Sequence, residues 1–387
     1  MRDATLCVHH PVVSEEGYAG LGVPVHRAST IVYPDADAFL NRAERGVDGY
    51  TYGLNGTPTT RTLEAQLTHL HGGARTIIVP SGQAAISMVM LSVLLPGDRV
   101  LIPDNAYPPV RTLCMDHLAA RGIDHTVYDP MIGAGIAALI DERTKLVWIE
   151  TPGSGTMETP DVPAIIAAAR QRGVLVGCDN TWATPLLFKP LAHGADFACE
   201  ALTKYVGGHS DLLLGSITVA DTALHQRLRK TLSELGIGVS PDECSLALRG
   251  MQTMALRLAH VGRLSEDFAR RLVGTPGVET VLHPALPSCP GHENWKRDFK
   301  GSSGVFSLVL APAARARMAT ALSDLKLFSI GASWGGTHSL LAPMEIAGIR
   351  TGTPWPHEGP LLRVSLGLED ADELWDELAG ALRRLAD

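Results

Sequence analysis

The chain lacks the cysteine pattern of a metal-bound or disulfide-linked protein. Its 387 residues include six cysteines, and none forms a C-x-x-C pair or has a matching histidine spacing. This scatter argues against a zinc site and a disulfide framework, so no metal centre is expected. The six are Cys7, Cys114, Cys178, Cys199, Cys244 and Cys289. Most are expected to be small buried side chains.

A long apolar run is also absent. The longest one, residues 86–95, is far shorter than a bilayer span, so no membrane-spanning helix is expected. Residues 1–5 carry no basic segment followed by an apolar one, which predicts a protein without a signal peptide, located in the cytoplasm.

Charge of one sign is nowhere concentrated. The net charge of -8 comes from 41 acidic and 33 basic side chains without long single-sign runs, so no nucleic-acid partner is expected. Apolar residues make up 45% and charged residues 19%, a composition typical of globular proteins with a sizeable core. We find no internal repeat and no low-complexity segment.

The length exceeds what one ordinary core accommodates, so two domains are expected. We predict an N-terminal arm over residues 1–50, a large domain over 51–247 and a smaller C-terminal α/β domain over 248–387. A long helix is predicted from Pro241 to about Arg271.

Strand-like runs alternate with helical stretches in the predicted large domain. The helical stretches include residues 84–95 and 162–172. The strand-like runs are residues 76–79, 99–102, 145–149, 174–177, 196–202 and 213–219. This alternation predicts an α/β fold with a mostly parallel sheet covered by helices on both faces, and a ligand site at the strand ends.

Lys204 is the most informative single residue. It follows a short apolar run and precedes the glycine pair Gly207 and Gly208. A partly desolvated lysine at a strand end has a lowered pKa and can form an imine with an aldehyde, as pyridoxal 5'-phosphate (PLP) requires. Taken alone, the position also suits an ordinary solvated loop lysine.

Two further segments could complete such a site. Ser81-Gly82-Gln83 closes a strand and opens a helix, whose N-terminal N–H groups could bind a phosphate. Asp179 ends another strand, where its carboxylate could pair with a protonated pyridine nitrogen. An ordinary connection and an Asx turn or helix cap remain the alternatives for these segments.

Tyr107 and Arg363 are the remaining candidates from residue type and position. Tyr107 lies just past a strand, where its ring could stack on a flat heterocycle. The alternative is ordinary packing at the rim of a pocket. Arg363 lies in an alternating strand, and its guanidinium could bind a substrate carboxylate through two hydrogen bonds, unless it faces water on an edge strand.

With these residues in order, the chain resembles the cysteine/methionine-metabolism family of PLP enzymes over nearly its whole length, and within it the bacterial cystathionine β-lyase branch. The resemblance implies the aspartate-aminotransferase-like fold, fold type I. It rests on Tyr52-Gly53, Gly56-Thr57-Pro58-Thr59, Ser81-Gly82-Gln83, Asn105-Ala106-Tyr107, Glu150-Thr151-Pro152-Gly153-Ser154, Asp179-Asn180-Thr181, Thr203-Lys204-Tyr205 and Ser333-Trp334-Gly335-Gly336.

The resemblance also implies roles for individual residues. Lys204 and Tyr107 are the expected catalytic residues, and Arg363, Ser333, Trp334 and Tyr52 the expected substrate-binding ones. The expected cofactor-binding residues are Lys204, Asp179, Tyr107, Ser81, Gly82, Gln83, Thr181, Thr203 and Tyr52. Tyr52 would reach the neighbouring subunit's site, because the family builds shared sites in homotetramers.

The implied reaction is a β-elimination on an amino-acid thioether. Cystathionine would give homocysteine, pyruvate and ammonia. The Pro152-Gly153-Ser154 segment and Trp334 favour this branch, whereas γ-lyases and γ-synthases usually show Pro-Ala-Asn-Pro at the former. A γ-synthase or γ-lyase, a broader cysteine-S-conjugate β-lyase and a cofactor-binding protein without turnover remain alternatives.

Three departures from the family pattern bear on these alternatives. Leu54 stands where an arginine often contacts the neighbour's phosphate, and Ala201 where a serine is common. Thr337-His338 replaces an aromatic residue and a glutamate that lyases often show. The first two predict a phosphate site that depends more on backbone N–H groups, and the third leaves the distal substrate contacts open.

Overall fold

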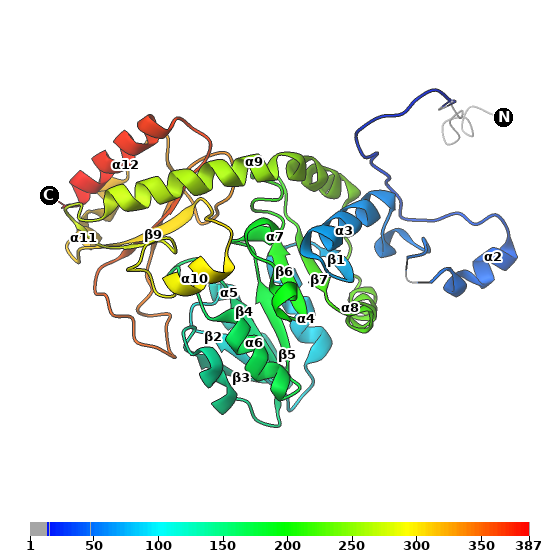
Figure 1. Ribbon diagram of the computed structural model, residues 1–387. Helices are drawn as coiled ribbons and strands as arrows, with labels where there is room; N and C mark the ends of the chain where they lie inside the picture. The colour runs from blue at the N-terminus through cyan, green and yellow to red at the C-terminus, as the bar shows by residue number, and fades with distance from the viewer. Residues whose placement is uncertain (1–13, 15, 47, 387) are drawn as a thin grey trace.

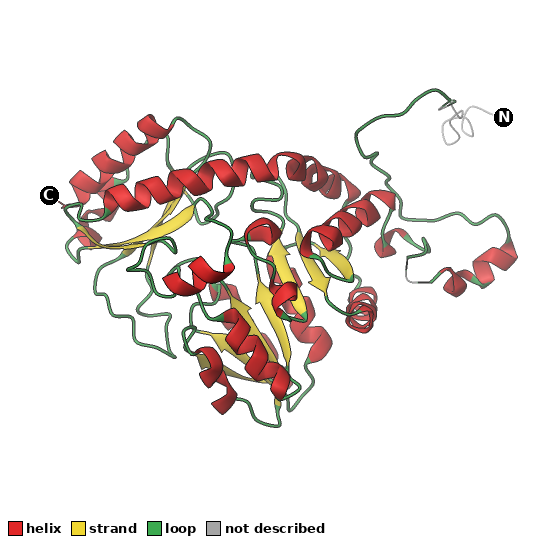
Figure 2. Cartoon of the chain, viewed as in Figure 1, coloured by secondary structure: helices red, strands yellow, loops and turns green. Residues whose placement is uncertain are grey.

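The computed structural model describes residues 14, 16–46 and 48–386. Two sheets form its framework, and a long helix runs past both of them (Figures 1 and 2). The first sheet has seven strands in the order β1-β7-β6-β5-β4-β2-β3. These are β1 (Arg75–Val79), β2 (Arg99–Pro103), β3 (Asp124–Tyr128), β4 (Thr144–Glu150), β5 (Leu175–Asp179), β6 (Phe197–Ala201) and β7 (Gly215–Val219).

Only β7 runs against its neighbours in this sheet, which confirms the mostly parallel arrangement predicted from the sequence. The sequence pattern did not predict β3, an edge strand whose first four residues are only partly buried. An edge strand with polar residues at Asp124, His125 and Thr126 lacks the apolar run by which buried strands are recognised. The strand predicted at 213–219 begins two residues later, at Gly215.

Alternate side chains of the strands enter opposite cores because successive residues of a strand point to opposite faces. Val147 and Ile149 of β4 belong to the core beneath α3, α6 and α9, whereas Leu146 and Trp148 belong to the core beneath α4, α5 and α8. These helices are α3 (Pro58–His71), α4 (Gly82–Val93), α5 (Pro108–Thr112), α6 (Val162–Gln171), α8 (Thr222–Leu235) and α9 (Pro241–Leu272). The sheet is therefore sandwiched between two helical layers.

The second sheet has five strands in the order β10-β11-β12-β9-β8 and packs against α11 and α12. Its strands are β8 (Val278–Leu282), β9 (Val305–Leu310), β10 (Ser329–Ile330), β11 (Leu340–Met344) and β12 (Leu361–Ser365). The helices α11 (Ala314–Ala321) and α12 (Ala371–Ala386) share a third core with the end of α9 around Phe268. The α9 helix thus contributes side chains to the cores of both sheets.

The remaining elements are short. They are the helices α2 (Ala36–Leu40), α7 (Thr184–Leu187) and α10 (His292–Asp298), the π-helical turn η3 (Leu113–Leu118), and the 3-10 turns η1 (Arg42–Arg45), η2 (Gly53–Asn55), η4 (Ala119–Arg121), η5 (Gly133–Ala138) and η6 (Pro190–His193). The described part of the N-terminal segment extends away from the two sheets (Figure 1). No helix in the described ranges is long and apolar enough to cross a membrane.

The division at residue 247 stays a prediction, and α9 crosses it. The described cysteines are all unpaired and buried, and Cys7 lies outside the described residues.

Candidate active site

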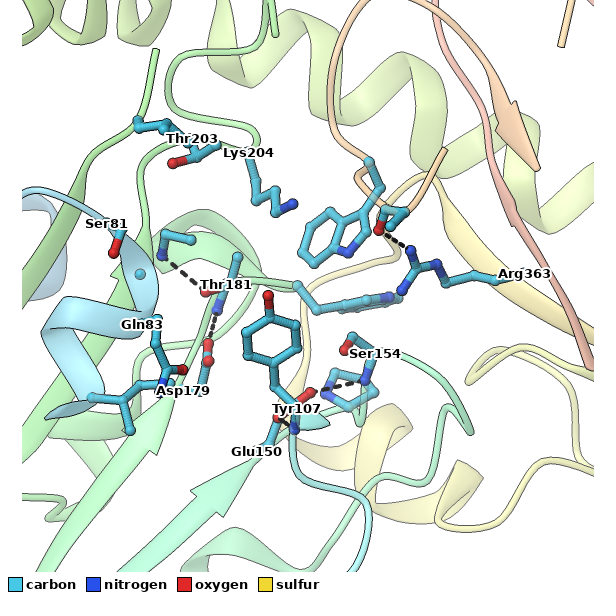
Figure 3. Close-up of a pocket in the computed structure, with 18 residues that line it drawn as sticks. Ser81, Gln83, Tyr107, Glu150, Ser154, Asp179, Thr181, Thr203, Lys204 and Arg363 are labelled. Carbon is cyan, nitrogen blue, oxygen red and sulfur yellow. Dashed lines mark hydrogen bonds between the residues drawn. The ribbon is translucent and has the colours of Figure 1, made fainter. Parts of the chain in front are cut away.

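The parallel strands bring together the polar side chains that follow them. Tyr107, Glu150, Asp179 and Lys204 lie at or just beyond the carboxyl ends of β2, β4, β5 and β6. Because these strands run in the same direction, their carboxyl ends meet at one edge of the sheet. Figure 3 shows these side chains around a common cavity, which Arg363 of β12 reaches from the second sheet.

The cavity has a volume of about 200 Å³ and contains most of the residues predicted for the site. The predicted residues that line it are Ser81, Gly82, Gln83, Tyr107, Asp179, Thr181, Thr203, Lys204, Trp334 and Arg363. Ser333 is not among the lining residues, but its hydroxyl lies 2.7 Å from the Lys204 amine. Tyr52 does not line the cavity. Its predicted role in the site of a neighbouring subunit stays a prediction.

Lys204 is held between the two sheets. Its amine donates a hydrogen bond to Ser333 and lies 5.2 Å from the centre of the Trp334 ring. The close approach needs Gly335, whose φ of +82° suits glycine and where a Cβ atom would lie 3.2 Å from the Lys204 carbonyl carbon. Burial and, secondarily, the charge of Arg363 lower the pKa of Lys204 to about 8, although Asp179 opposes this shift.

Asp179 forms the Asx turn that residue type alone suggested, and it also faces the cavity. One carboxylate oxygen accepts a hydrogen bond from the Thr181 N–H at 2.9 Å. Burial raises the pKa of Asp179, whereas Thr181 and the charge of Lys204 act in the opposite direction. The local turn therefore orients the carboxylate toward the site, and the two interpretations are compatible.

The start of α4 is suited to bind an anion. Gly82 and Gln83 are the first two helical residues, whose N–H groups have no acceptor earlier in the helix. The Ser81 hydroxyl accepts the Ala84 N–H instead, and so caps the helix. Gly82 lies against Ala201, since a Cβ atom on Gly82 would come within 2.6 Å of the Ala201 side chain. These two N–H groups and the helix dipole favour a phosphate here.

Arg363 is buried in β12, and its guanidinium donates a hydrogen bond to the Ala332 carbonyl. Burial lowers the pKa of Arg363, while Tyr107 and Glu150 partly offset this shift. The alternative of an edge-strand arginine facing water is wrong, because β12 lies between β11 and β9. A buried cation that lines the cavity is suited to bind a carboxylate.

Glu150 and Ser154 line the cavity, although no role for them was predicted from the sequence. Glu150 belongs to one of the segments that carry the family resemblance. Its position at the end of a strand could have identified it as a site residue. Leu213 and Trp182 also line the cavity, and an apolar side chain leaves no chemical signal in the sequence. Thr337 and His338 do not line it, and their side chains hydrogen-bond to each other at 3.1 Å.

These groups fit a flat aldehyde that carries a phosphate and a basic ring nitrogen, as PLP does. The helix start at Gly82 suits the phosphate, the Lys204 amine suits the aldehyde, and the Asp179 carboxylate suits the protonated nitrogen. The side chains of Tyr107 and Trp182 supply flat apolar surface.

The comparisons with known proteins agree with this chemistry. The model of the family described as "Cys/Met metabolism PLP-dependent enzyme" matches residues 4–383. The cystathionine beta-lyase MetC of Escherichia coli (strain K12) is 38% identical over 368 residues, which cover 93% of each chain. The L-alanine/L-glutamate racemase of Wolbachia pipientis wMel is 37% identical over 374 residues, 94% of this chain and 92% of that protein.

A solved structure is similar as well. The crystal structure of cystathionine gamma synthase from Xanthomonas oryzae pv. oryzae in complex with cystathionine superposes with a TM-score of 0.85 at 32% identity, and covers 96% of this chain and 95% of that one. This similarity confirms the predicted fold, that of fold-type I PLP enzymes. On the cavity geometry and the family match together, the chain belongs to the Cys/Met metabolism PLP-dependent enzyme family, and its cofactor is pyridoxal 5'-phosphate.

Proposed function

We propose that the protein is a carbon-sulfur β-lyase that converts cystathionine to homocysteine, pyruvate and ammonia. The observation that carries the proposal is the position of the Lys204 amine between Asp179, on the cofactor side, and Arg363 with Ser333, on the side suited to a substrate carboxylate. The cystathionine beta-lyase relative from Escherichia coli supports the same substrate.

PLP, when bound, supplies an electron sink that stabilises negative charge at the substrate Cα. Lys204 would carry the cofactor until the substrate amine replaces it, and its freed amine would then remove the Cα proton and deliver it to the departing sulfur. Asp179 would keep the ring nitrogen protonated, and Tyr107 would stack on the ring. Ser81, Gly82, Gln83, Thr181 and Thr203 would hold the cofactor at its phosphate end.

Arg363 would orient the substrate through its carboxylate, assisted by Ser333 and Trp334. The Ala332 carbonyl and the buried strand hold the guanidinium in place before the substrate binds, which lowers the entropic cost of orienting it. A substrate fixed in this way presents its Cα–H bond to Lys204.

A direct assay tests the reaction. Purified holoenzyme is incubated with cystathionine while pyruvate, homocysteine and 2-oxobutyrate are followed together. Pyruvate and homocysteine in equal amounts are the expected products. 2-Oxobutyrate in place of pyruvate would contradict the proposal and favour a γ-lyase, and comparison of several cysteine thioethers distinguishes a strict enzyme from a broader S-conjugate lyase.

A second candidate function is amino-acid racemisation, favoured by the Wolbachia relative named L-alanine/L-glutamate racemase. Racemisation shares the Cα proton removal with β-elimination but needs no leaving group. L-Alanine therefore separates the two activities, because it has no β-substituent to eliminate. A rate of D-alanine formation that matches or exceeds pyruvate release from cystathionine would favour the racemase.

Arg363→Lys should raise KM about 10- to 100-fold, because lysine keeps the charge but cannot make the bidentate pair of hydrogen bonds to a carboxylate. kcat should fall less than KM rises. Steady-state kinetics with cystathionine measure both, and Arg383→Lys on the exposed face of α12 is the matched control. An unchanged KM in the Arg363 variant would remove the residue from the substrate site.

Covalent attachment of PLP to the cofactor-free protein should accelerate as the pH rises toward about 8 and level off above it. Burial lowers the pKa of Lys204 to about 8, and only the neutral amine attacks an aldehyde. Asp179 raises this pKa, so Asp179→Asn should move the midpoint to lower pH. The absorbance of the attached cofactor follows the rate, and a midpoint near that of free lysine would contradict the assignment.

We further propose a cytoplasmic homotetramer assembled from dimers, in which Tyr52 of one subunit reaches the site of another. An exposed fraction of 52% for Tyr52, and its absence from the cavity of its own chain, support this arrangement. Residues 1–50 would serve as an arm, 51–247 as the PLP-binding domain and 248–387 as the C-terminal domain. Sedimentation of the purified holoenzyme measures the subunit number.

A further inference from the structure

Glu150 is a buried carboxyl group that the proposed reaction does not use. It ends β4, is 4% exposed and lines the cavity. One carboxylate oxygen accepts the Tyr107 N–H at 2.5 Å, and the other accepts the Ser154 N–H at 3.0 Å (Figure 3). A single side chain therefore joins the turn that follows β2 to the turn that follows β4.

The two turns have little freedom to separate or approach. A Cβ atom on Gly153 would lie 2.5 Å from the side-chain amide of Asn105, so the turns are in direct contact. The Glu158 carbonyl adds a second connection, since it accepts the Gly153 N–H at 3.0 Å and the side-chain amide of Asn105 at 3.4 Å. The Glu150 carboxylate lies at this contact, and it holds Tyr107 and Ser154 at fixed positions on the cavity wall.

Tyr107 depends on its backbone for its position. Its side chain is 43% exposed, and its hydroxyl makes no hydrogen bond to the residues that the structure describes. The Tyr107 carbonyl accepts the Val110 N–H at 2.8 Å, and its N–H is bound by Glu150. Loss of the Glu150 contact would free one side of the turn that carries the ring.

A carboxylate is a costly choice at this position. Glu150 lies beside Asp179 in the register of the two strands, and burial together with the charge of Asp179 raises the pKa of Glu150 to about 8. The hydrogen bonds from Ser154 and Tyr107 lower the pKa of Glu150 and so partly offset this cost. A neutral apolar residue would avoid the desolvation penalty but could not accept two N–H groups.

We infer that Glu150 is a positioning residue, which holds the Tyr107 ring against the cofactor and ties it to the Ser154 turn beside Arg363. The inference rests on the proposed role of Tyr107 at the cofactor. Glu150 acts through these two turns rather than by touching the reacting atoms. Both carboxylate oxygens are needed, because the two N–H donors belong to separate segments.

Glu150→Gln tests this with almost no change in size. The amide offers one acceptor oxygen, so one of the two N–H groups would face an NH2 group instead. A buried N–H left without an acceptor predicts a drop of about 10- to 100-fold in kcat/KM for β-elimination. The near-UV and visible circular dichroism of the bound cofactor should change too, because the Tyr107 ring shifts relative to it.

Glu158→Gln is the matched control, since Glu158 is a buried carboxylate eight residues farther along that pairs with Arg350 and Thr156 outside the main cavity. It should lower the melting temperature yet leave the cofactor dichroism as in the wild type. If both glutamine variants alter the dichroism equally, or if Glu150→Gln only lowers the melting temperature, the positioning role is refuted.

Two further variants keep the test decisive. Glu150→Asp retains both acceptor oxygens and should recover part of the lost activity and dichroism, even if the glutamine variant folds poorly. In a Tyr107→Ala background, Glu150→Gln should cost at most about threefold more, because residues that act together are not additive. A full additional loss would contradict action through Tyr107.

The dichroism is measured without substrate, which separates this inference from the proposed reaction. A wild-type enzyme that releases no pyruvate would refute the β-lyase activity alone. Unchanged cofactor dichroism in Glu150→Gln would refute the positioning role alone.

Discussion

Lys204→Ala should reduce β-elimination at least about 1,000-fold, the largest effect expected for any single substitution in this chain. The variant would lack the amine that, in the proposed reaction, carries the cofactor and moves the Cα proton to sulfur. Pyruvate release from cystathionine measures the loss. The fold should survive, because alanine keeps the backbone contact with Gly335 and removes only a side chain that lines the cavity.

Borohydride reduction and peptide mass mapping locate the attachment of the cofactor independently of turnover. The reduced cofactor should be found on the peptide that contains Lys204 in the wild type and be absent from the variant. Lys300→Ala, which changes an exposed lysine outside the cavity, should retain both the adduct and the activity. An adduct on any other lysine would overturn the assignment.

Asp179→Asn should lower kcat about 100- to 1,000-fold, because a cationic ring nitrogen in a buried site would lose its charged partner. The asparagine carbonyl can still accept the Thr181 N–H, so the turn after β5 should persist. The loss should therefore come from the missing charge rather than from local unfolding. Steady-state kinetics with saturating PLP measure it.

The matched control for this substitution is Asp196→Asn. Asp196 also accepts a backbone N–H, from Val176 at 2.8 Å, but it precedes β6 and lies at the opposite end of the strands from Asp179. The Asp196 variant should keep a kcat close to that of the wild type. Equal losses in the two variants would show that the effect at Asp179 is structural.

The sequence pattern was sufficient to predict site residues where a reactive side chain follows directly on an apolar run. The apolar runs that end at Val79 and Ile149 belong to buried strands, and the polar residues after such strands lie at the cavity. Lys204, Asp179 and Gly82 could be found in this way because a reactive side chain or a helix start directly follows an apolar run. The edge strand β3 could not, because its exposed position permits polar residues.

The sequence pattern did not predict the contacts between segments that are distant along the chain. Glu150 stands in a segment singled out in the sequence, yet only the fold brings its two oxygens to the N–H groups of Tyr107 and Ser154. The same holds for Ser333, whose hydroxyl reaches Lys204 across 129 positions of the chain. Spacing along the chain carries no information on such pairs, because loops of any length can connect them.

The sequence by itself determined the mostly parallel α/β sheet and the set of side chains suited to PLP. Local propensity and alternation of apolar residues are sufficient for that, since they act over a few neighbouring positions. Only the tertiary structure decided that Arg363 is buried beside Lys204, that Asp179 makes an Asx turn while facing the cavity, and that Glu150 joins two turns. Each of these depends on burial and on contacts between strands, which exist only once the two sheets have packed around the cavity.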